Sequence, residues 1–84
     1  MKKRKLLERA LAHPADLCFD EMVALSEAFG FHLSRVRGSH HVFTHPDVRE
    51  LVNIQNVAGK VKPYQVRQFL ELVERYNLAI GGEP

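Results

Sequence analysis

The most constraining feature of this sequence is Gly30, because the spacing of the apolar residues changes on either side of it. Before Gly30, apolar residues recur every three to four positions, as on one face of a helix. After it, apolar and polar residues tend to alternate, as in strands with one buried face. Glycine readily takes the left-handed conformation that ends a helix. The pattern therefore predicts helices before this residue and strands directly after it.

Three helices are expected. The first covers Leu6–Leu11 and must end before Pro14, since proline disfavours helical geometry in the residue that precedes it. The second begins with Asp20 as its capping residue and ends at Gly30. The third begins with Pro63, carries a core-facing stripe of apolar residues and ends near Asn77. That stripe consists of Val66, Phe69, Leu70, Val73 and Tyr76.

Three strands are expected at residues 31–37, 39–45 and 50–56, separated by a glycine turn and a Pro-Asp pair. The first run is irregular, because strict alternation would point Leu33 and Val36 to opposite faces. We therefore expect a bulge or an early strand end in this run.

The predicted fold class is α+β, with the order α-α-β-β-β-α in a single domain of residues 1–84. A three-stranded antiparallel sheet with helices packed on one face is the two-layer layout of the double-stranded-RNA-binding-like fold. The first helix would be an added outer element. Residues 79–84 are expected to form a flexible tail.

Charge and cysteine content restrict the class of protein further. The net charge is only +2, but residues 35–67 hold six Lys or Arg against two Asp or Glu, which suits a polyanionic partner. Cys18 is the only cysteine, so no internal disulfide can form. No long apolar run suggests a membrane segment. We expect a cytoplasmic protein.

The densest group of chemically active residues is the run Gly38-Ser39-His40-His41, where a glycine turn opens into a strand. With Phe43 facing the core, alternation points His41 inward and His40 outward, near Arg35 or Arg37. An exposed histidine among cations can transfer protons at a phosphodiester. The competing interpretation is a structural role for each histidine.

Other chemistry is weakly supported. The five histidines invite a zinc site, but His40 and His41 point to opposite faces and no helical pair at four-residue spacing exists, so no metal or other cofactor is expected. Ser39 and Cys18 lack a carboxylate-oriented base of the kind that activates a nucleophile.

A second group of mainly basic residues lies in the loop before the last helix and in the first turns of that helix. Its members are Lys60, Lys62, Tyr64 and Arg67. The N-terminus of a helix with lysines beside it favours the binding of a phosphate group. The same residues are equally consistent with an ordinary solvated loop before the helix.

Three segments, residues 29–31 (Phe-Gly-Phe), 38–46 (Gly-Ser-His-His-Val-Phe-Thr-His-Pro) and 59–63 (Gly-Lys-Val-Lys-Pro), resemble the HicA family of toxins from bacterial toxin–antitoxin pairs. The resemblance covers residues 20–78 and leaves 1–19 as an N-terminal extension. It implies a double-stranded-RNA-binding-like fold, ribosome-independent mRNA cleavage, and a HicB-type antitoxin as partner. It also implies that the histidine after Gly-Ser, here His40, is catalytic.

Together these features predict a metal-independent mRNA endoribonuclease with His40 as the catalytic residue. Gly38, Ser39 and His41 would support the site, and His41 is a candidate for the second proton transfer. The expected RNA contacts are Arg35, Arg37, Lys60, Lys62, Tyr64 and Arg67. The alternative is a module of the same fold that binds RNA or DNA without cleaving it.

Overall fold

The computed structural model describes residues 2–81 and has the element order that the sequence predicts. Its elements are α1 (Lys3–Ala12), a 3₁₀ turn (Pro14–Asp16), α2 (Phe19–Ala28), β1 (His32–Arg37), β2 (His40–His45), β3 (Val48–Gln55) and α3 (Pro63–Arg75). The strands form one antiparallel sheet in the order β1-β2-β3. The α+β prediction is confirmed.

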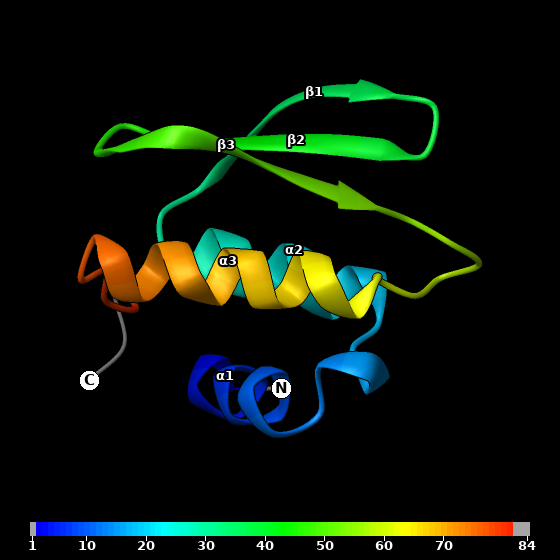
Figure 1. Cartoon of the computed structure of the whole chain (residues 1–84), viewed down its shortest axis with the longest axis horizontal. Coiled ribbons are helices and arrows are strands. Elements are labelled where there is room, and N and C mark those ends of the chain that lie inside the picture. Colours follow the sequence, from blue (N-terminus) through cyan, green and yellow to red (C-terminus); the bar gives the residue numbers. More distant parts are fainter. Residues whose placement is uncertain (1, 82–84) are drawn as a thin grey trace.

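The molecule has three layers (Figure 1). The sheet covers one side of α2 and α3, and α1 lies on the other side of these two helices. The core lies mainly between the sheet and the α2–α3 layer and extends to Leu6 and Ala10 of α1 on the other side of that layer. Its largest fully buried side chains include Phe31, Phe43, Phe69, Leu17, Met22, Leu25, Ile54 and Val66. The expected outer helix is therefore a third layer, far from the open face of the sheet.

The N-terminus of α2 differs from the prediction, because Cys18 and not Asp20 is the capping residue. The Glu21 carboxylate accepts a hydrogen bond from the Cys18 backbone N–H at 3.0 Å, which satisfies a donor at the start of the helix. Arg9 of α1 forms an ion pair with the same carboxylate. The backbone N–H of Cys18, together with Arg9, lowers the pKa of Glu21.

The predicted end of α2 is confirmed. Gly30 has a φ of +93°, and a Cβ built there would meet His45 Nε2 at 3.0 Å. Both the backbone conformation and the close approach of the imidazole therefore require glycine.

The third strand begins two residues earlier than predicted, at Val48, which pairs with His45. Pro46 and Asp47 alone form the turn. His45 Nδ1 accepts the Asp47 N–H at 3.0 Å and so stabilises this short connection.

The start and stop of α3 match the prediction, with Pro63 in the first turn and Asn77 at a φ of +52° just after the helix. Gln65 is buried, and its side-chain oxygen accepts the Gln55 N–H at 2.8 Å, joining the helix to the end of β3. The predicted tail at 79–84 lies partly outside the described residues. Within them, the Gly81 N–H donates to the carbonyl of Ala28 at 2.9 Å.

Candidate functional site

A bulge in β1 decides which of its side chains share a face with His40. The pairing register shifts between Leu33 and Arg35, so Ser34 is an extra residue without a partner, and the expected irregularity is confirmed. One inserted residue reverses the facing of the residues that follow it. Leu33 therefore shares the face of its partner Phe43, whereas Arg35 and Arg37 face outward, and Arg37 pairs directly with His40.

His40 lies exposed on the open face of the sheet. Its Nδ1 lies 3.3 Å from Oδ1 of Asn53, on the neighbouring strand. Together with Val42 and the two arginines, Arg35 and Arg37, these side chains line a shallow hollow of about 240 Å³. When Asn53 accepts a hydrogen bond from Nδ1–H, the lone pair is on Nε2, which is the form of imidazole that can accept a proton from a ligand.

The turn before His40 is tied to the end of β3. Gly38 has a φ of +58° as the first of two turn residues, as a type II′ hairpin requires. The Ser39 carbonyl accepts the Asn56 N–H at 2.9 Å, and Ser39 Oγ accepts a hydrogen bond from the side-chain Nε2 of Gln55 at 3.3 Å. These contacts give Ser39 a structural role in holding the turn.

The ring of His41 lies on the face opposite to that of His40. It packs on Phe19 with ring centroids 4.6 Å apart, and its Nδ1 lies 3.1 Å from the Ser39 carbonyl. The inward direction expected for His41 is confirmed. This residue does not line the hollow that contains His40.

The second basic group lies at the same end of the sheet as the Gly38-Ser39 turn (Figure 1), because the Asn56 N–H links the two segments. Residues 57–60 form a tight turn with positive φ at Ala58 and Gly59. The Lys60 ammonium lies 3.7 Å from the Cys18 sulfur, and Lys62 is the exposed residue that precedes α3. Tyr64, in the first turn of α3, is also exposed.

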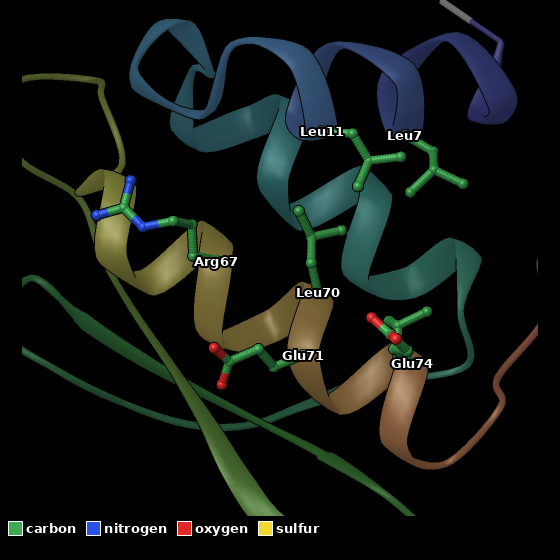
Figure 2. A pocket seen from close by; sticks show the side chains of 7 residues that line it. Leu7, Leu11, Arg67, Leu70, Glu71 and Glu74 are labelled. Atoms are coloured by element: carbon green, nitrogen blue, oxygen red, sulfur yellow. The ribbon is translucent and has the colours of Figure 1, made fainter.

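Arg67 lies elsewhere. Figure 2 shows it in a groove between α1 and α3, beside Leu11 and Leu70 and away from the sheet. The structure thus brings Arg35, Arg37 and His40 together and places the Lys60–Tyr64 segment at the same end of the sheet. It does not bring Arg67 to this surface.

Sequence reasoning did not identify Asn53 as the partner of His40. The two residues are diagonal neighbours across β2 and β3, and this relationship depends on the strand register.

Within residues 2–81, no group of three or more His, Cys, Asp or Glu side chains lies close enough together to hold a metal ion. One further histidine, His45, packs its ring on Phe31 with centroids 5.0 Å apart. In the same part of the chain, no helix is long and apolar enough to cross a bilayer.

A family model described as the HicA toxin of bacterial toxin–antitoxin systems matches residues 19–74, from the start of α2 to near the end of α3. Neither the curated proteins nor the solved structures gave a significant match. The matched region includes the whole sheet and leaves α1 outside.

Proposed function

Since the chain belongs to the HicA family of toxins from bacterial toxin–antitoxin systems, we propose that it is an endoribonuclease that cleaves mRNA without the ribosome and without a metal ion. The observation that supports this proposal most is the arrangement of His40. An exposed imidazole, bound at Nδ1 by Asn53, lies in an open hollow beside Arg35 and Arg37. This is a proton acceptor next to two cations that attract a phosphodiester.

In the proposed reaction, His40 Nε2 takes the proton of a ribose 2′-hydroxyl, and the resulting oxygen attacks the adjacent phosphorus. The O2′–P bond forms and the P–O5′ bond breaks. The products are a 2′,3′-cyclic phosphate and a 5′-hydroxyl. Because the hollow is open to solvent and His41 lies on the other face of the sheet, water supplies the proton to the leaving O5′.

Arg35 and Arg37 would offset the negative charge that grows on the phosphate oxygens in the transition state. Lys60, Lys62 and Tyr64 would hold the RNA on either side of the cleaved bond, with the lysines contacting phosphates and the exposed tyrosine stacking on a base. Arg67 is not part of this set, because it lines the groove between α1 and α3.

Family membership also implies an antitoxin partner. We propose that a HicB-type antitoxin covers the open face of the sheet, so that Arg35, Arg37 and His40 are inaccessible in the complex. Both partners and the mRNA substrate would meet in the cytoplasm.

The test compares the purified chain with His40→Ala on a 5′-labelled RNA in the presence of EDTA, with binding measured separately. We expect the wild type to produce fragments that end in a cyclic phosphate, and His40→Ala to bind RNA normally while losing at least about a hundredfold in rate. Cleavage by His40→Ala at the wild-type rate contradicts the mechanism. Binding by both proteins with cleavage by neither supports the non-catalytic alternative instead.

A further inference from the structure

The N-terminal helix builds an apolar groove that the proposed nuclease site does not use. The groove has a volume of about 460 Å³ and lies between α1 and α3. Leu7 and Leu11 of α1 point toward Leu70 of α3, as Figure 2 shows, and Val73 completes the apolar lining. Leu11 is 63% exposed, although it sits in a helix whose opposite face buries Leu6 and Ala10. The Leu11 side chain is therefore available for a contact with another molecule.

The charges at the groove are arranged so that they match a second copy of the same surface. Arg67 lies toward the N-terminal end of the α3 wall, and Glu74 lies toward its C-terminal end (Figure 2). A two-fold axis that passes close to Leu70 makes the two α3 helices antiparallel. It then places Arg67 of each copy opposite Glu74 of the other.

The apolar wall formed by α1 is self-complementary as well. Leu7 and Leu11 are one helical turn apart on α1, so a two-fold axis between them places Leu7 of one copy against Leu11 of the other. Both the apolar and the charged residues of this surface are thus complementary to themselves, which is the requirement for an isologous contact.

We propose that the chain forms a two-fold dimer through this groove, with reciprocal Arg67–Glu74 ion pairs around a centre of leucines. The sheet lies on the other side of the α2–α3 layer, so both open faces stay accessible and point away from the dimer contact (Figure 1). Because α1 lies outside the family match, one wall of this interface belongs to the extension. The inference does not depend on whether His40 cleaves RNA.

The test measures the mass of the full chain by sedimentation equilibrium from micromolar to millimolar concentration. His40→Ala is introduced into every protein so that expression does not depend on toxicity. We expect the mass to rise from that of the 9.6-kDa chain toward twice that value. Leu11→Gln should weaken the dimer at least about tenfold, because each dimer loses two leucines from the contact. Leu51→Gln, at a leucine 56% exposed on β3, is the matched control and should leave the dimer unchanged.

A charge exchange identifies the interface independently. Arg67→Glu places two glutamates opposite each other at both symmetry-related contacts, and Glu74→Arg does the same with two arginines, so each variant should weaken the dimer. The double variant R67E/E74R should restore it, because opposite charges again face each other. Thermal melts of each variant confirm that it is folded. A chain that stays monomeric up to the millimolar range overturns the proposal and leaves the groove to a different protein. A dimer that is insensitive to Leu11→Gln and to the charge exchange overturns it equally, because the contact then lies elsewhere.

Discussion

Asn53 Oδ1 lies 3.3 Å from Nδ1 of His40, and this contact orients the one exposed imidazole that the structure shows beside two arginines. Accepting Nδ1–H fixes the ring tautomer in which Nε2 carries the lone pair. Asn53 is therefore a positioning residue in the proposed reaction, because it acts through His40 and does not touch the bond that breaks.

The first prediction concerns this contact. Asn53→Leu should lower kcat by about tenfold or more with little change in KM, because the ring loses its orientation while the arginines that bind phosphate remain. Asn53→Asp should instead retain the orientation and move the acid limb of the pH–rate profile to higher pH, since a carboxylate favours the protonated ring. Both are measured by initial rates on a short RNA over a pH series. Equal loss in both variants with an unchanged pH profile would show that Asn53 has only a packing role.

The second prediction concerns RNA affinity and salt. Arg35→Ala and Lys62→Ala should each weaken RNA binding and reduce the slope of log K against log salt by about one, because each variant removes one phosphate contact. Fluorescence anisotropy at several salt concentrations measures both values. Arg4→Ala is the control, since Arg4 lies on α1 on the far side of the molecule from the sheet. A slope that changes as much for Arg4→Ala as for Arg35→Ala contradicts the proposed binding face.

The third prediction follows from the lowered pKa of Glu21, which comes first from the backbone N–H of Cys18 and then from Arg9. Because the pKa in the folded chain is below that in the unfolded chain, the carboxylate stabilises the fold fully above its ordinary pKa. This stabilisation is lost as the pH falls through the lowered value. The Tm of the wild type should therefore drop more steeply than that of Glu21→Gln as the pH is lowered through the acidic range. Parallel curves for the two proteins would mean that this carboxylate is not linked to folding.

The fourth prediction concerns the junction between α2 and β1. Gly30→Ala should destabilise the chain by about 1–3 kcal/mol, because alanine is strained at a φ of +93° and its Cβ meets the His45 ring. Gly81→Ala should be close to neutral, since a Cβ at Gly81 meets nothing within 4 Å. Chemical denaturation of both variants gives the comparison. A cost for Gly30→Ala no larger than that for Gly81→Ala would contradict this account of the junction.

Local sequence signals were sufficient for most of the fold. The helix stop at Gly30, the proline start of α3 and the inward direction of Phe43 depend on the conformational preferences of single residues and on short-range alternation. Local sequence signals predicted the capping residue of α2 less well. Asp20 has the better intrinsic capping side chain, but Glu21 reaches back to the N–H of Cys18 and joins Arg9 of a different helix.

The sequence by itself determined that His40 and His41 point to opposite faces, since neighbours in a strand always do. Only the tertiary structure decided which other residues accompany each of them. The bulge at Ser34 turns Arg35 and Arg37 to the face of His40, and the pairing of β2 with β3 brings Asn53 to its ring. The packing of α1 on α3 likewise draws Arg67 into a groove away from the sheet. Register and helix packing are set by contacts between residues far apart in the chain, so no short stretch of sequence contains them.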